Sequence, residues 1–315
     1  MNVAGLSLSG GRRENFFLCL LEHYPDKGRW FLKSLHQVKD EEIQDRDEVL
    51  RTWVEQYELQ HLVVDFPLSR PPCETCLPEC KGAQHCPRGQ VCAVREEMRT
   101  LLAEDEKFCQ ENPKKYEQER VKAEELDWSQ DLLHKTADQH LLSRSFKRKL
   151  RKGFTPYWHR PIDFWIWKNY YDQLLSVFKT SYDSYGHSSM MLLARLKYLI
   201  RHLPVTLAMH ESSEKLVLLE LYRAGLIGKF QLLQLFDLEM QSLARESLIK
   251  GMEQQLQLFI YDNDFEMLVK NPKAFDSFLL AIAGQRLLMS NLRPMPNWAN
   301  ADGGNFIVPD FRPQG

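Results

Sequence analysis

The chain has 315 residues, of which 43% are hydrophobic and 27% charged, and its formal net charge is −2. This composition excludes a disordered chain, and the balanced charge excludes a molecule that is drawn as a whole to nucleic acid or to an acidic membrane. Residues 1–11 lack the basic and apolar regions of a signal peptide, and no apolar run approaches the roughly 18 residues that span a bilayer. We therefore expect a cytosolic protein without membrane contact, in which any surface for nucleic acid is local.

Three short apolar or alternating runs open the chain, at residues 2–9, 15–24 and 29–38. Gly10-Gly11 and the segment 25–28 separate them, and both spacers have the composition of turns. The pattern predicts an antiparallel meander of three strands.

A helix and a buried strand follow the meander. The helix is predicted after Asp40, where apolar residues recur at helical spacing. These residues are Ile43, Val49, Leu50, Trp53 and Val54. The run HLVVDF at 61–66 is short, β-branched and apolar, as is typical of a strand buried on both faces, and Pro67 ends it.

Residues 71–202 interrupt this α/β pattern. Segment 71–92 is rich in Cys, Pro and Gly and is not expected to form regular structure, whereas segment 93–126 is charged and helix-prone. Further helices are predicted at 161–182 and 189–202. We interpret the whole stretch as an insertion that combines a cysteine-rich metal loop with a helical region.

The chain beyond the insertion returns to alternating strand and helix. VTLAM at 205–209 predicts a fifth strand with Glu211 just past its end, and the residues from Ser213 predict a helix to Ala224. Two more helices are predicted at 231–259 and 272–289, the latter capped by Asn271, and the closing FIVPDF is read as an edge strand. Without the insertion the element order is that of an RNase H-like fold: a mixed five-stranded sheet with flanking helices, formed by residues 1–70 and 203–315.

Three acids are placed where such a sheet collects its ligands, at the carboxyl ends of its strands. Asp65 ends the fourth strand, Glu211 follows the fifth, and Asp276 lies in the first turns of the last helix. Phosphodiester hydrolysis with Mg²⁺ or Mn²⁺ requires converging carboxylates, which these residues could supply. The alternative is structural: each acid caps a turn or interacts with a helix N-terminus.

Six segments follow one another along nearly the whole chain: VAGLSLSG, VVDFPLS, PPCETCLPECKGAQHC, FTPYWHRPIDFW, VTLAMHESSEK and AFDSFLLAIAG. In this order they resemble a family of predicted RNase H-like nucleases. The resemblance implies a metal-dependent nuclease with Asp65, Glu211 and Asp276 as catalytic acids. The departure is Ser7, which stands where the family places an aspartate that bridges both metals. A neutral hydroxyl is a poor bridging ligand, so an active nuclease and an inactive nucleic-acid- or protein-binding relative remain equal alternatives.

A cysteine cluster follows the fourth strand. Cys73, Cys76, Cys80 and Cys86 have the spacing C-x2-C-x3-C-x5-C, and Cys92 follows six residues later. Thiolates this close in a reducing compartment favour a structural Zn²⁺ site, with an iron–sulfur cluster or no metal as alternatives. The sequence leaves open whether Cys92 replaces one of the nearer four.

A basic stretch next to aromatic residues is the candidate surface for nucleic acid. Cations beside aromatic rings suit phosphate contacts and base stacking, although a solvated helix face has the same pattern. The sequence carries no indication of the oligomeric state. The basic residues are Lys147, Arg148, Lys149, Arg151, Lys152 and Arg160.

Overall fold

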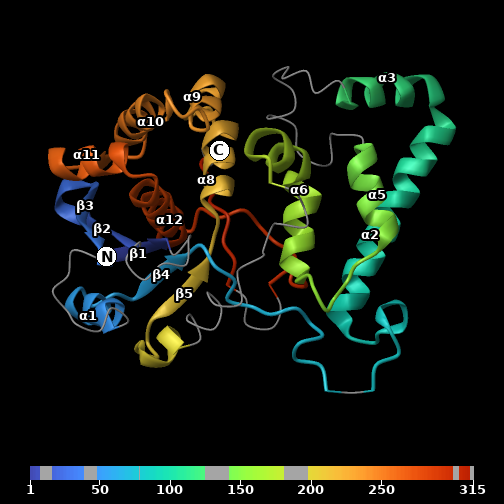
Figure 1. Cartoon of the computed structure of the whole chain (residues 1–315), viewed down its shortest axis with the longest axis horizontal. Coiled ribbons are helices and arrows are strands. Elements are labelled where there is room, and N and C mark those ends of the chain that lie inside the picture. The colour runs from blue at the N-terminus through green and yellow to red at the C-terminus, as the bar shows by residue number, and fades with distance from the viewer. Residues whose placement is uncertain are drawn as a thin grey trace. The chain divides into compact units, whose positions relative to one another are not determined.

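The computed structural model describes residues 1–7, 16–38, 48–77, 79–124, 142–180, 198–300 and 305–312 (Figure 1). The chain divides into two compact units. The sheet unit comprises Met1–Leu68, Ser188–Pro294 and Asn305–Gly315, and the helical unit comprises Ser69–His187 and Met295–Gly304. Among the described residues, no helix is long and apolar enough to cross a membrane.

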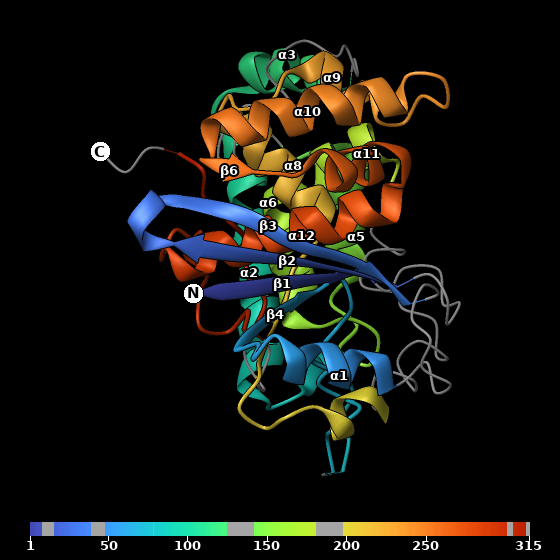
Figure 2. The ribbon, with the colours of Figure 1, turned by 90° about the vertical axis from the view of Figure 1, so that its left-hand side faces the viewer.

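The sheet unit is an α/β structure with a mixed six-stranded sheet in the order β5-β4-β1-β2-β3-β6. Figure 2 shows β3, β2, β1 and β4 side by side in that order. Strand β1 is antiparallel to β2 and parallel to β4, while β5 is parallel to β4. The strands are β1 (Asn2–Ser7), β2 (Phe17–Tyr24), β3 (Arg29–Gln37), β4 (His61–Val64), β5 (Ala208–Glu211) and β6 (Leu258–Phe259).

The described strands confirm the antiparallel meander, in which β2 and β3 are joined by a short 3-10 turn, Pro25–Lys27. Gly28 ends this turn in a left-handed conformation, at φ 59°, which glycine adopts without steric cost. The turn predicted at Gly10-Gly11 lies outside the described residues, as do Asp40, Ile43, Pro78 and most of the helix predicted at 189–202.

The prediction of five strands was wrong, because the sheet of the described residues has six. Residues 231–259 were expected to form a single helix, but they form α9 (Lys229–Gln234), α10 (Gln241–Gln255) and then β6, which pairs in parallel with β3 at Trp30 and Phe31. The sequence contains no Gly or Pro at this helix-to-strand change, so its apolar residues were read as helical throughout. The predicted edge strand FIVPDF forms only isolated bridges, Phe306 to Glu211 and Pro309 to Leu292.

One face of the sheet is covered by α1 (Glu48–Gln56). Side chains alternate between the two faces of a strand, so Ala4 and Leu6 of β1 point to the same side. They join one buried cluster with Trp53 and Val54 of α1. The apolar spacing that predicted this helix therefore marks the residues that it buries.

The opposite face is covered by α12 (Pro272–Leu288), which packs unusually close to β1. A Cβ atom added to Gly5 would lie 2.1 Å from the backbone oxygen of Ser277 and 2.3 Å from the backbone nitrogen of Ala281. A Cβ atom added to Gly284 would lie 2.3 Å from Val3. Two glycines, one on each element, therefore permit this contact. The N-terminus of α12 is capped as predicted, because the Asn271 side chain accepts hydrogen bonds from two backbone N–H groups.

Two further helices complete the described part of the sheet unit. They are α8 (Glu214–Arg223) and α11 (Asp262–Lys270). Both pack on α12, so this central helix is enclosed by the sheet and by its helical neighbours.

The helical unit has its own buried core. Phe146 and Leu150 of α5 pack with Phe164 and Trp167 of α6, so these aromatic side chains belong to the core. By contrast, Trp158 before α6 is 55% exposed. The helices are α2 (Gly89–Glu111), α3 (Pro113–Glu124), α5 (Arg144–Lys152) and α6 (Pro161–Phe178), preceded by a 3-10 turn at Ala83–His85.

We predict that Gly5→Ala lowers the free energy of unfolding of the sheet unit by about 3 kcal/mol or more, because the new methyl group meets rigid backbone of α12. Gly251→Ala is the matched control. Gly251 lies inside α10, and the nearest atom to its added Cβ would be 3.9 Å away, so this change should stabilise by about 0.5–1 kcal/mol. Urea denaturation followed by circular dichroism measures both. Equal stabilities of the two variants would contradict the close contact between β1 and α12.

Candidate functional site

Ser7 and Asp65 meet at the carboxyl ends of two neighbouring parallel strands. β1 and β4 run side by side, with Leu6 opposite Val64, so the next residues of each strand emerge together. The Ser7 hydroxyl donates a hydrogen bond to Oδ2 of Asp65, with a distance of 2.7 Å between the oxygens. Ser7 is fully buried and Asp65 is half-buried. This hydrogen bond therefore occupies one of the two carboxylate oxygens of Asp65.

Asp276 reaches the same edge of the sheet from α12. Burial raises the pKa of Asp276 to about 7, and the carboxylates of Glu214 and Asp65 add to this rise. Lys273, whose Nζ lies 3.1 Å from Oδ2 of Asp276, works against the rise. This rise favours the protonated form of Asp276. Because Asp65 and Glu214 both influence the pKa of Asp276, the three carboxylates belong to one electrostatic environment.

Glu211 lies within β5, whereas the sequence predicted it just beyond that strand. It is the last residue of β5, and it is buried. Its Oε2 accepts a hydrogen bond from the backbone N–H of Leu68 at 3.0 Å. Because Leu68 belongs to the segment that leaves β4, Glu211 fixes the path of the chain just beyond Asp65.

Glu214 and Lys273 were not among the predicted site residues. Glu214 begins α8, shortly after β5. Ser213 is the N-cap residue of α8, but its side chain makes no capping hydrogen bond. The sequence pattern that could have identified Glu214 is its position three residues beyond a parallel strand, which brings it to the carboxyl edge of the sheet. Lys273 lies one turn from Asp276 on α12, a spacing typical of helical ion pairs.

The acids do not form a ready metal centre. Across the part of the chain that the structure describes, no three His, Cys, Asp or Glu side chains are arranged to hold a metal ion. A two-metal site needs several carboxylate oxygens within coordination distance of both ions, and the first-strand position offers only the hydroxyl of Ser7. The residues present therefore do not fit a two-metal centre.

The four predicted cysteine ligands do lie near one another. The pKa of the Cys73 thiol is raised by burial and then by Cys86, Cys80 and Cys76, while Arg88 lowers it. The backbone N–H of Gly82 donates to Sγ of Cys80, at 3.4 Å. Such N–H donors favour the thiolate form that binds metals. The donor set suits zinc, although its sulfurs are not arranged as ligands in this structure.

Cys92 contacts the backbone of Cys86, one of this set of four. Its thiol donates to the backbone oxygen of Cys86 at 3.3 Å, and Nη2 of Arg95 lies 3.3 Å from its sulfur. Arg95 also donates to the backbone oxygens of Ala83 and Cys86. Cys92 thus stabilises the turn before α2.

Two of the six predicted nucleic-acid-binding residues are engaged inside the protein. Lys147 is paired with Asp105 at 2.9 Å, and both side chains are nearly buried. Arg160 is 3% exposed and is paired with Asp163 at the start of α6. Burial keeps both groups away from a surface ligand.

The remaining four basic residues lie on the outer part of α5. Arg148, Arg151 and Lys152 are exposed, and they share one helix face because they lie three and four residues apart. Lys149 is half-buried. The opposite face is anchored by the buried side chains of Phe146 and Leu150. We call Arg148, Arg151 and Lys152 the basic face of α5.

The chain matches no model of a protein family, and searches among curated proteins and solved structures find no match.

Proposed function

We propose that the protein is an RNase H-like, nucleic-acid-binding protein that lacks two-metal nuclease activity. The fold assignment is supported by the strand order β5-β4-β1-β2-β3, with an antiparallel meander at one side and parallel strands at the other. A mixed five-stranded sheet with flanking helices is what the element order predicted, and β6 adds a sixth strand.

The hydrogen bond between Ser7 and Asp65 carries the proposal that nuclease activity is lost. The position that would supply a bridging carboxylate carries a buried hydroxyl, which donates to Asp65 at 2.7 Å. A donated hydrogen bond reduces the capacity of Asp65 to act as a metal ligand. Asp276 forms an ion pair with Lys273, so two of the predicted acids already interact with other side chains of the protein.

The basic face of α5 supports binding of nucleic acid. It presents three exposed cations on one side of a helix that is anchored by its buried side. Cations in this arrangement attract phosphates without reading the base sequence, and their contribution falls with salt concentration.

We predict that Arg148→Gln/Arg151→Gln/Lys152→Gln weakens binding of a fluorescent single-stranded oligonucleotide, measured by anisotropy. Each lost phosphate contact should reduce the slope of log K against log salt by about 0.7. The control is Arg99→Gln/Lys107→Gln/Lys114→Gln, which removes the same charge from exposed positions on α2 and α3. Equal affinity of both variants and the parent at several salt concentrations would disprove a role for the basic face.

A second candidate function is divalent-metal-dependent phosphodiester hydrolysis. The observation that favours it is the shared environment of Asp65, Glu214 and Asp276 at one edge of the sheet. Carboxylates that repel one another gain stability from a bound cation, and Mg²⁺ or Mn²⁺ prefers oxygen ligands. These residues would hold a single ion, since Ser7 offers no bridging carboxylate for two.

Calorimetry with Mn²⁺ tests this candidate. Binding should weaken roughly tenfold from pH 8 to pH 6, because protons compete with the metal at Asp276, whose pKa is about 7. Asp65→Asn/Asp276→Asn should abolish binding. No binding by the parent would exclude the metal site. Nuclease activity of the parent would refute our first proposal, whereas activity gained only in Ser7→Asp would identify a decayed nuclease.

We also propose that Cys73, Cys76, Cys80 and Cys86 bind one structural Zn²⁺. The proximity of these four thiols and the separate role of Cys92 support this set of ligands. Zinc would close the irregular loop that precedes α2 and stabilise it, since segments of this kind contain little core of their own.

Elemental analysis of protein purified without added metal should find about one zinc per chain. Cys73→Ser/Cys76→Ser should remove it, whereas the matched control Cys92→Ser should retain it. Iron together with a brown colour would instead indicate an iron–sulfur cluster. Loss of zinc in Cys92→Ser would show that the ligand set is wrong.

A further inference from the structure

Four aromatic side chains contact one another in a row on the sheet unit. The ring centroid of Phe31 on β3 lies 5.0 Å from that of Tyr24 at the end of β2 and 5.3 Å from that of Phe259 on β6. The ring centroid of Tyr261, just after β6, lies 5.0 Å from that of Phe259. We call Tyr24, Phe31, Phe259 and Tyr261 the aromatic row.

The register of the sheet explains why these rings share one face. Glu22, Phe31 and Phe259 stand opposite one another on β2, β3 and β6, so their side chains point to the same side. Glu22 also stands opposite Asn2 of β1, two residues before Ala4, which packs with α1. The aromatic row therefore lies on the same face as α1, toward the β3 and β6 end of the sheet (Figure 2).

The aromatic row is open to solvent. Tyr24, Phe259 and Tyr261 are 40%, 38% and 55% exposed, and Phe31 is half-buried. Single exposed apolar side chains are common on proteins, but exposed rings that contact one another are typical of a binding surface. The pairs Tyr24–Phe31 and Phe259–Tyr261 meet edge to face, with interplanar angles of 79° and 89°. The ring that contributes its edge to such a pair keeps its faces out of the contact.

Two exposed cations accompany the aromatic row. Nζ of Lys27 lies 5.1 Å from the ring centroid of Phe31 and 5.9 Å from that of Tyr24. Arg29 stands opposite Tyr24 in the sheet, so its side chain points to the same face. Within the described part of the chain, neither Lys27 nor Arg29 forms an ion pair with a carboxylate.

The acids close to the aromatic row limit its attraction for anions. Glu22 is paired with Lys33 at 2.8 Å, so these two charges compensate each other. Asp26 and Asp262 are exposed and neighbour the row in the sequence. A ligand bound here would therefore gain more from contact with the rings than from charge.

The outer edge of the sheet beside the aromatic row is closed. The backbone N–H of Ile260, just after β6, donates to Oε1 of Glu253 on α10 at 3.1 Å. A partner strand that extended the sheet at this edge would have to displace this contact. A ligand of the aromatic row is therefore expected to lie on the face of the sheet.

We propose that the aromatic row stacks the bases of a single-stranded nucleic acid. Bases have flat faces that stack on aromatic rings whatever their sequence, and the phosphates between them suit the exposed cations Lys27 and Arg29. Aromatic side chains on the open face of a sheet can bind single-stranded RNA in this way. This inference rests on the nucleic-acid binding proposed above, and it adds a surface on the sheet unit that differs from the basic face of α5.

Fluorescence anisotropy with a short labelled oligothymidylate tests the proposal. Phe259→Leu/Tyr261→Leu should weaken binding about tenfold or more, because leucine retains apolar bulk but offers no ring to a base. The loss should be similar at low and high salt, whereas the loss in Arg148→Gln/Arg151→Gln/Lys152→Gln should shrink as the salt concentration rises. The control is Phe230→Leu, which removes an 80% exposed ring from α9 and should bind like the parent.

An abasic oligonucleotide of the same length separates stacking from damage to the fold. The parent should bind it about tenfold more weakly than oligothymidylate, and Phe259→Leu/Tyr261→Leu should lose most of this difference.

Three outcomes would overturn the proposal. Equal affinity of Phe259→Leu/Tyr261→Leu and the parent would do so while leaving binding through the basic face of α5 intact, and so would equal affinity of the parent for both oligonucleotides. Self-association of the parent that is lost in Phe259→Leu/Tyr261→Leu, with unchanged oligonucleotide binding, would assign the row to a contact between two copies. No binding of either oligonucleotide by the parent would refute this inference and the proposed function together.

Discussion

The close contact between β1 and α12 is the constraint on which the sheet unit depends. At Gly5 the strand approaches the helix so closely that an added Cβ atom would lie 2.1 Å from the helix backbone. Gly284 provides the corresponding space on the helix, where an added Cβ atom would meet Val3 at 2.3 Å. Because the atoms that Gly5 approaches belong to the helix backbone, no rotamer change could make room for a side chain there, and the helix is held closely over the strand.

This contact also determines the position of the acids. Ser7 follows Gly5 by two residues and so lies on the same face of β1, while Asp276 precedes Ser277, the residue closest to Gly5. The geometry of one strand and one helix thus brings Asp276 into the electrostatic environment of Asp65, which β4 places beside Ser7. The acidic edge therefore results from packing in the core.

The sequence was informative where local patterns decide structure. The turn at Gly28, the cap at Asn271 and the apolar spacing of α1 were each readable from neighbouring residues. β6 was missed because its two residues become a strand only through pairing with β3, and no local signal marks them. The positions of Asp65 and Asp276 at one edge of the sheet could be anticipated because strand ends and helix starts collect there. The burial of Lys147 could not be anticipated, since its partner Asp105 lies on another helix, whereas the partner of Arg160, Asp163, is only three residues away.

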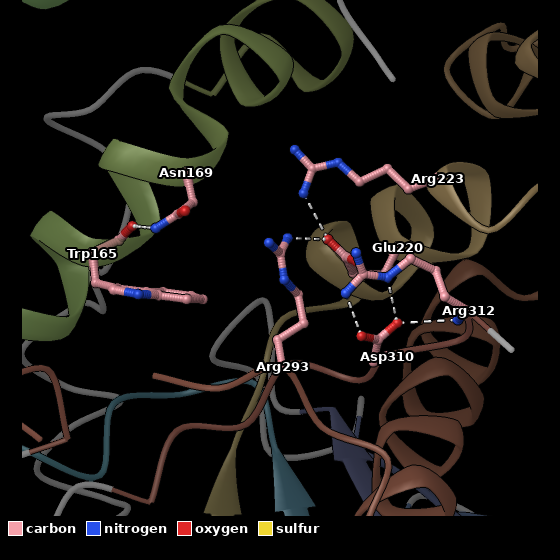
Figure 3. Close-up of polar contacts among 7 residues, drawn as sticks. All are labelled: Trp165, Asn169, Glu220, Arg223, Arg293, Asp310 and Arg312. Carbon is pink, nitrogen blue, oxygen red and sulfur yellow. Dashed lines mark hydrogen bonds and ion pairs between the residues drawn. The ribbon is translucent and has the colours of Figure 1, made fainter. Parts of the chain in front are cut away.

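Helix α8 connects the two charged regions of the sheet unit. Its first residue, Glu214, acts on Asp276, and six residues later Glu220 receives Arg223 and Arg293. Six residues turn an α-helix by about 240°, so the two carboxylates lie on different faces of α8. The first turn of this helix therefore serves the acidic edge of the sheet, whereas its last turns form the ion pairs with Arg223 and Arg293 that Figure 3 shows and so hold the segment after α12.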